Sequence, residues 1–370
     1  MMGSAQLEIQ LIAIVVAAAC AVPGVFLVLR RMALLSDAIS HAILLGIVIG
    51  FFIVKDLASP VLVIGATLTG VLTVSLVELL NRTRLVKEDA AIGLVFPALF
   101  SIGVILISRY AGNIHLDTDS VLLGELAFAP FNRLELFGSD LGPISLYVMG
   151  GILVLNLLFV IIFFKELKLA TFDSGLAAAL GFSPTLIHYA LMTLVSVTAV
   201  GAFDAVGSIL VVALMIAPPA TAYLLTDRLS RMILLAAIFG IFSAISGYWV
   251  AHILDASIAG CMASMSGVLF GLIFLIAPRR GILALARRRV NQKWEFAQTM
   301  LAIHLYQHEN LPEAAYECSY AHLGEHLRWT TSHANKVILK AQKAKILNRI
   351  GDLLQLTDRG RELARKSLVR

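Results

Sequence analysis

The sequence is poor in charged residues. Only 14% of its 370 residues are Asp, Glu, Lys or Arg, and 59% are hydrophobic, whereas soluble domains carry about 25% charged and roughly 45–50% apolar residues. The mean hydropathy is +0.88. This balance argues against a soluble globular protein. It indicates an integral membrane protein, because many apolar runs approach the roughly 20 residues that span a bilayer.

Two kinds of site are also missing. The three cysteines form no C-x-x-C pair, which leaves no sign of a disulfide framework or of a thiolate metal site. No G-x-x-x-x-G-K-[ST] loop occurs, so the chain lacks the P-loop that cradles nucleotide phosphates. We expect no cleavable signal peptide, because no basic segment precedes the first apolar run.

Nine apolar segments predict transmembrane helices. The region 185–225 allows two assignments. Gly201, Gly207 and the adjacent Pro218 and Pro219 would also allow one broken or re-entrant span there, and therefore eight crossings in total. The two prolines predict a kink or, alternatively, a hinge in a moving part. The nine segments lie at 8–29, 34–54, 58–80, 90–108, 144–164, 185–204, 206–225, 231–253 and 257–277.

Lys and Arg gather in alternate connections between these segments, whereas the long connection 109–143 is acidic. Since cytoplasmic loops are enriched in Lys and Arg, the basic connections are predicted to be cytoplasmic. We expect an outside N-terminus, an inside C-terminus and a place in the cytoplasmic (inner) membrane. The basic residues are Arg30, Arg31, Arg82, Arg84, Lys87, Lys165, Lys168, Arg228, Arg231, Arg279, Arg280, Arg287, Arg288 and Arg289.

The second apolar segment contains two ionisable residues. Asp37 and His41 are four residues apart, so they lie on one face of a helix. A charge at the centre of a membrane helix costs roughly 2.5–3.5 kcal/mol on insertion scales, and such residues usually face a bundle interior or a watery path. Carboxylate oxygen and imidazole nitrogen suit manganese, iron or zinc. We predict a metal site on a permeation path; in the simpler alternative, the two side chains only bond to each other or to a neighbour.

One helix supplies only two ligands to such a site. Two-fold pairing of subunits would bring four ligands to a shared axis. Gly46 and Gly50 continue the same spacing of four residues, which predicts a close approach to another helix.

Four further stretches of the chain carry a recognisable pattern. They are RRMALLSDAISHAILLGIVIGF (30–51), EDAAIGLVFPALFSIGVILIS (88–108), FKELKLATFDSGLAAALGF (164–182) and VGSILVVALMIAPPATAYLLTDRL (206–229). In this order they resemble segments of the manganese/zinc/iron permeases of ABC importers. The resemblance covers about residues 8–280, and the family's metal-coordinating Asp and His correspond to Asp37 and His41.

The resemblance implies a permease subunit that moves divalent Mn, Zn or Fe into the cytoplasm by ATP-driven alternating access. It implies no enzymatic activity and no permanently bound cofactor in this chain, because a separate ABC ATPase would hydrolyse the ATP. It also implies an extracytoplasmic metal-binding protein and a second permease subunit, either identical or a related paralogue. The alternative, from a different class, is a membrane-tethered, metal-responsive regulator that acts through its C-terminal part.

The third stretch resembles a cytoplasmic loop of the family, F-D-x-x-x-A-x-x-x-G. Within it we predict one short helix that Thr171 caps, with Asp173 in its first turn and Gly181 at its end. Such a helix could dock on the ATPase, with Glu166, Asp173 and Gly181 as coupling residues. An ordinary amphipathic surface helix is the alternative.

The apolar spans end before residue 290. Residues 290–370 carry 12 Lys and Arg against 8 Asp and Glu, and they resemble the winged helix-turn-helix domain of iron-dependent-repressor-type regulators. We therefore predict an all-α polytopic permease domain with eight or nine transmembrane helices at 1–285 and a small cytoplasmic α+β domain at 290–370. The predicted elements of this domain are helices at 294–309, 320–329, 331–345 and 358–368 and a hairpin at 346–357 that turns at Gly351-Asp352.

Basic residues mark the third of these helices. Lys336, Lys340 and Lys343 would suit DNA phosphates, but a basic surface beside anionic membrane lipid is equally natural. Basic charge alone binds DNA without sequence specificity. We therefore do not expect nucleic acid as a partner and favour contact with the ATPase or the second permease.

Histidines also gather in this domain. His304 and His308 are four residues apart, as are His322 and His326. Two histidines at this spacing on one helix face can bind Zn. The alternative to such a metal site is a set of ordinary surface histidines.

Overall fold

The chain folds into two compact units in a computed structural model: an N-terminal unit, Met1–Arg280, and a C-terminal unit, Gly281–Arg370. The structure describes residues 4–55, 59–110, 126–136, 139–323 and 327–368.

Within its described residues, the N-terminal unit has nine helices that are long and apolar enough to cross a membrane. Gly207 separates the sixth from the seventh with φ +80°, and its amide donates to the Phe203 carbonyl oxygen. Each of these two helices is long and apolar enough to cross a membrane by itself, which supports two spans in this region over one broken span. Pro218 and Pro219 lie inside the seventh helix without ending it. The nine are α1 (Ser4–Leu29), α2 (Leu34–Val54), α3 (Pro60–Arg82), α4 (Glu88–Tyr110), α6 (Ile144–Ile162), α9 (Pro184–Val206), α10 (Ser208–Leu225), α11 (Leu229–Leu254) and α12 (Ile258–Ile276).

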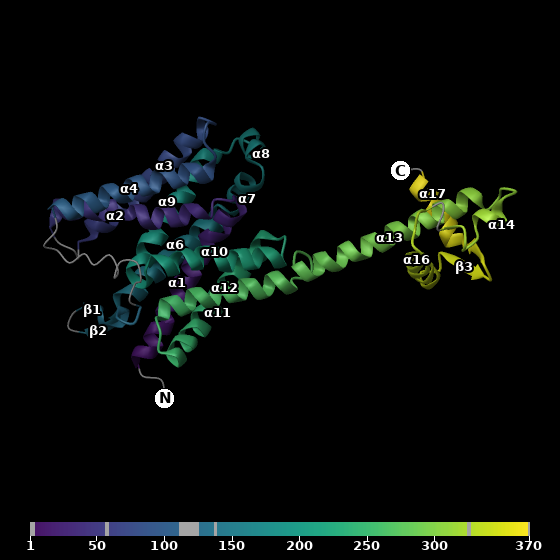
Figure 1. The fold of residues 1–370 in the computed structure, drawn as a ribbon. Coiled ribbons are helices and arrows are strands. Elements are labelled where there is room, and N and C mark those ends of the chain that lie inside the picture. Colours follow the sequence, from purple (N-terminus) through teal and green to yellow (C-terminus); the bar gives the residue numbers. More distant parts are fainter. Residues whose placement is uncertain (1–3, 56–58, 111–125, 137–138, 324–326, 369–370) are drawn as a thin grey trace. The chain divides into compact units, whose positions relative to one another are not determined.

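These helices pack in two groups (Figure 1). One group contains α2, α3, α4 and α9, and the other contains α1, α6, α10, α11 and α12. Helix α1 also contacts α9, and α10 contacts α2. Because α1 touches both groups, it is the most deeply buried of the nine helices.

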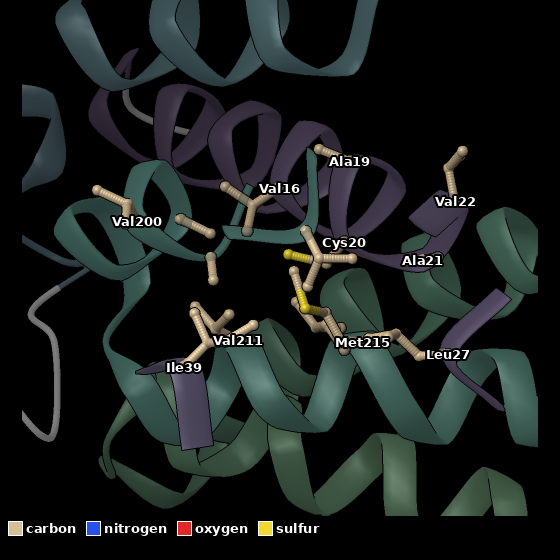
Figure 2. Close-up of a cluster of buried hydrophobic side chains, with 14 of the residues drawn as sticks. Val16, Ala19, Cys20, Ala21, Val22, Leu27, Ile39, Val200, Val211 and Met215 are labelled. Atoms are coloured by element: carbon tan, nitrogen blue, oxygen red, sulfur yellow. The ribbon is translucent and has the colours of Figure 1, made fainter. Parts of the chain in front are cut away.

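The core lies where the two groups meet (Figure 2). Cys20 of α1 and Met215 of α10 are fully buried there, with Ile39 of α2 and Val200 of α9 nearby. Gly24 lets α1 and α10 approach, because a Cβ atom at this position would lie 2.1 Å from the Met215 carbonyl oxygen. Close packing of apolar side chains and a small residue thus joins the two groups.

A short hairpin precedes α6. It follows a 3-10 turn, η1 (Ala129–Phe131), and consists of antiparallel β1 (Arg133–Leu136) and β2 (Ser139–Pro143). The Arg133 guanidinium contacts the carboxylates of Asp140 at 2.5 Å and Glu8 at 3.1 Å. Arg133 thereby ties the hairpin to the start of α1. Much of the acidic connection predicted at 109–143 lies outside the described residues, which omit 111–125.

The C-terminal unit has its own apolar core, which includes Leu301, Leu305, Val337 and Leu354. The predicted third helix, hairpin and last helix are confirmed, and Gly351 turns the hairpin with φ +65°. A helix at 320–329 is not confirmed: residues 320–322 form a turn, and 324–326 lie outside the described residues. The elements are α13 (Ile282–His308), α14 (Ala314–Glu317), α16 (Thr331–Lys343), β3 (Leu347–Ile350), β4 (Leu353–Leu356) and α17 (Asp358–Leu368).

Candidate functional site

Helix α2 places Asp37 in its first turn and His41 one turn later. The Oδ1 atom of Asp37 lies 3.3 Å from Nε2 of His41, and their side chains are 40% and 28% exposed in the single chain. The predicted shared face is therefore confirmed. Within the described parts of the chain, no third His, Cys, Asp or Glu completes a three-ligand group at this pair.

Neighbouring side chains define the surroundings of the pair. The His41 ring lies 5.8 Å from that of Phe96 and 6.1 Å from that of Phe100, both on α4. The Ser40 hydroxyl donates to the Ser36 carbonyl oxygen at 2.9 Å, so it serves its own helix. The pair thus has an aromatic wall on one side and a partly open side.

The helix that carries the pair lies tightly against α3. A Cβ atom on Gly46 would lie 2.1 Å from the carbonyl oxygen of Gly65, and one on Gly50 would lie 3.2 Å from the Cα of Leu62. The close approach predicted from the glycine spacing is confirmed. This contact with α3 fixes the backbone of α2 in the turns that follow the Asp37–His41 pair.

The loop between α6 and α9 contains two helices, α7 (Phe164–Phe172) and α8 (Ser174–Ala179). The prediction of one helix that Thr171 caps is therefore wrong. Asp173 separates the two helices and caps α8, where its carboxylate accepts a hydrogen bond from the Leu176 amide at 2.9 Å.

The other two predicted coupling residues lie just after the end of α8 and in the first turn of α7. Gly181 follows α8 with φ +87°, a conformation that favours glycine. Its amide donates to the Ala178 carbonyl, and the Phe182 amide donates to Ala177, each at 3.0 Å; these bonds end α8. Glu166 is half-buried in the first turn of α7.

A polar network connects α7 to the transmembrane helices. Nε of Arg30, directly after α1, donates to the Thr171 hydroxyl at 3.2 Å, and Nη1 of Arg30 lies 3.3 Å from Nδ1 of His188 on α9. Nε2 of His188 lies 3.7 Å from the Glu78 carboxylate on α3. Burial lowers the pKa of Arg30 to about 10, which still leaves it charged at neutral pH. The loop is therefore bonded to Arg30 at the end of α1, and Arg30 connects it through His188 on α9 to Glu78 on α3.

Three of the four predicted histidines of the C-terminal unit gather around Glu317. His304 and His308 on α13 converge with Glu317 at the end of α14, and one possible ligand atom from each lies within 4.8 Å of the others. Nε2 of His322 lies 3.5 Å from Oε2 of Glu317. His326 lies outside the described residues. Sequence reasoning missed Glu317, because only tertiary folding brings it to the histidine pair.

A cavity of about 450 Å³ lies elsewhere in the N-terminal unit. Residues of α11, of α12 and of the segment from Leu126 to Phe128 line it, and His252 and Asp255 supply ionisable groups. Neither Asp37 nor His41 lines this cavity. It is therefore separate from the pair on α2.

The full length of the chain resembles a known membrane protein. It is 50% identical over 362 residues to the zinc transport system membrane protein TroD of Treponema pallidum, with 98% of each chain covered. It is 47% identical over 284 residues to the manganese transport system membrane protein MntD of Bacillus subtilis, which covers 77% of this chain and 96% of that relative. The second match leaves no room in that relative for a unit of the size of Gly281–Arg370.

Two solved structures have a similar fold. PsaBC from Streptococcus pneumoniae, in complex with Fab, matches with a TM-score of 0.64 and 30% identity over 77% of this chain and 96% of that one. An inward-facing metal-chelate-type ABC transporter matches in fold with a TM-score of 0.51 and 20% identity over 72% of this chain and 84% of that one. The profile of the ABC 3 transport family matches residues 5–277. The chain therefore belongs to the ABC 3 transport family.

Proposed function

We propose that this chain is the membrane permease subunit of an ABC importer that moves a divalent transition metal ion, Mn, Zn or Fe, into the cytoplasm. The carrying observation is the Asp37–His41 pair, 3.3 Å apart on an apolar helix. Its oxygen and nitrogen atoms suit these ions. Relatives named as zinc and manganese transport proteins support the same cargo. The metal is the transported substrate and not a resident cofactor.

The partly open side of the pair favours assembly with a second permease subunit. Ionisable groups in a membrane usually face protein or water, yet Asp37 is 40% exposed in the single chain. A two-fold related subunit, identical or paralogous, would cover this face and bring a second Asp–His pair to it. Four ligands would then replace two and bind the ion more firmly.

The energy would come from a separate ABC ATPase that docks on α7 and α8. Glu166, Asp173 and Gly181 shape this surface, and the Arg30 network bonds it to α1 and α9. A displacement of α7 by the ATPase would pull on those helix ends directly. Polar bonds of this kind give the coupling a physical connection to the transport helices.

The remaining partners follow from the predicted orientation. An extracytoplasmic metal-binding protein would deliver the ion on the side opposite the basic loops. The C-terminal unit, with Arg287–Arg289 near its start, would lie in the cytoplasm against anionic lipid and the ATPase. Its helix, turn and hairpin elements support a winged-helix-like domain. The alternative of a membrane-tethered regulator is not supported, because the family and the relatives are transport proteins.

Metal uptake by cells that contain the chain with its ATPase tests the proposal. We expect Asp37→Ala and His41→Ala to abolish uptake, because each removes one of the two ligands. Co-purification with the ATPase should persist, because both residues belong to α2 and neither is part of α7 or α8. Ser40→Ala is the matched control on the same helix, since its hydroxyl bonds only to α2. Normal uptake by both ligand variants would refute the proposal.

A further inference from the structure

The C-terminal unit contains a second cluster of metal-binding side chains. His304, His308 and Glu317 each place one possible ligand atom within 4.8 Å of the other two. His304 and Glu317 are each 8% exposed, and so is His322 beside them. Burial of several ionisable groups at one point is costly unless they are paired or bind a metal. This cluster is distinct from the pair on α2, which lies in the other compact unit.

Folding brings His304, His308 and Glu317 together from two helices, α13 and α14. The spacing of four places His304 and His308 on one face of α13, with their rings 4.8 Å apart. Helix α14 ends at Glu317, and the next residue, Cys318, accepts a hydrogen bond from the Leu354 amide of β4 at 2.9 Å. The hairpin therefore anchors the main chain directly after Glu317. A site supported by packed elements has the rigidity that metal binding needs.

One hydrogen bond also orients a histidine as a ligand. Nε2 of His304 lies 3.1 Å from the main-chain carbonyl oxygen of Glu317. An imidazole that donates from Nε2 carries its lone pair on Nδ1, and a nitrogen with a lone pair can ligate a metal. Histidine ligands commonly donate their other ring N–H to a backbone carbonyl in this way.

We propose that His304, His308 and Glu317, joined by His322, bind a divalent transition metal ion in the C-terminal unit. His322 can be the fourth ligand, because its Nε2 atom is 3.5 Å from Oε2 of Glu317. Three imidazoles and one carboxylate form an N/O donor set that suits Zn²⁺, Fe²⁺ or Mn²⁺. Binding would join α13 to α14 and stiffen the contact between them.

The site gives the unit a regulatory role. A transporter of such ions raises their cytoplasmic concentration, and a binding site in an attached cytoplasmic unit would respond to that rise. Tethering makes contact between this unit and the ATPase intramolecular within the complex. Metal occupancy can therefore act back on transport. This regulatory role rests on the proposed transport function, whereas the metal site itself does not.

Zinc binding to the full chain tests the site. The chain is purified in detergent with Asp37→Asn, so that the pair on α2 does not contribute, and is titrated with Zn²⁺ by calorimetry after chelator treatment. We expect one bound ion, and an affinity at least about tenfold lower in His308→Gln and in Glu317→Gln, which removes the charge with little change of volume. His333→Gln is the matched control, because this half-buried histidine of the same unit contacts Trp294 and Trp329 instead.

A second measurement needs no substitution in the cluster. Zn²⁺ added to the Asp37→Asn chain should slow amide hydrogen exchange at the end of α13 and in α14. No zinc binding, no change in exchange, or equal affinity in the three variants would overturn the site. With Asp37 restored, His308→Gln should shift the metal concentration at which uptake slows by about tenfold or more. Absent uptake in the unmodified chain would refute the transport function and leave the zinc titration unaffected.

Discussion

At the scale of single residues, Asp37 and His41 combine a short mutual contact with a partly open face. Their spacing was enough to predict one helix face, because 3.6 residues complete each turn. Their exposure was not predictable, because it depends on how α4 places Phe96 and Phe100 beside the imidazole. That exposure is the observation on which the proposed second subunit rests.

Gly46 offers a stability test of the helix that carries the pair. Gly46→Ala would place a Cβ atom 2.1 Å from the Gly65 carbonyl oxygen, so α2 and α3 must separate. We expect a loss of about 1–3 kcal/mol in stability, the usual cost of overpacking, seen as a lower Tm of the purified protein. The matched control is Gly93→Ala on α4, where nothing lies within 4 Å of the new Cβ. Equal Tm values for the two variants would contradict the tight α2–α3 packing.

The histidine cluster shows which ligands a sequence pattern can predict and which it cannot. The spacing of His304 and His308 was visible in the sequence and indicated a possible metal pair. Glu317 had no local signal, because it lies in a short helix of four residues and reaches the pair only through the fold. His326, which the sequence spacing pairs with His322, lies outside the described residues.

At the scale of elements, the long helices were the most predictable feature. Their apolar runs are bounded by charged or small residues, so the predicted spans agree with the nine helices to within a few residues. The loop at 164–182 was less predictable. Thr171 and Asp173 are both good caps, and the structure uses Asp173 while Thr171 bonds to Arg30. A tertiary contact decided between two equivalent local signals.

The two-helix loop makes a prediction about ATPase attachment. Asp173→Lys removes the cap of α8, Glu166→Lys reverses a charge on α7, and Gly181→Val puts a β-branched residue at φ +87°. Each should reduce the amount of ATPase that co-purifies with the chain by several-fold and leave metal binding at α2 unchanged. The reason is that each variant reshapes the docking surface without touching the pair.

Gly175→Ala is the control for these loop variants. A Cβ at this position would lie 3.4 Å from the Asp173 carboxylate, an ordinary contact, and Ala favours the helix. ATPase co-purification should therefore be unchanged. Full co-purification by the Glu166, Asp173 and Gly181 variants as well would show that the ATPase docks elsewhere.

At the scale of the whole molecule, the chain combines a transport core with an additional unit. The family profile ends at residue 277, and the C-terminal unit begins at Gly281. The match to TroD covers 98% of both chains, whereas the match to MntD covers 77% of this one. The family match therefore assigns the transport function to the core, and control of transport is the role proposed for the additional unit.

Deletion of residues 290–370 tests this division. We expect the shortened chain to insert stably and to retain metal uptake, because the nine apolar helices and the Asp37–His41 pair remain. The response of uptake to rising metal, or the retention of the ATPase during purification, should change. The measurements are uptake against metal concentration and co-purification, compared with the intact chain. Unchanged values for both would leave the C-terminal unit without the regulatory role.

The most direct test of the central claim is transport by purified components. The chain and its ATPase are reconstituted into liposomes with the metal-binding protein, and uptake of radioactive manganese or zinc is followed with and without ATP. We predict ATP-dependent uptake by the unmodified complex and by Ser40→Ala. We predict none by Asp37→Asn or His41→Gln, although both complexes assemble. ATP-dependent uptake by these two variants at the unmodified rate would contradict the account.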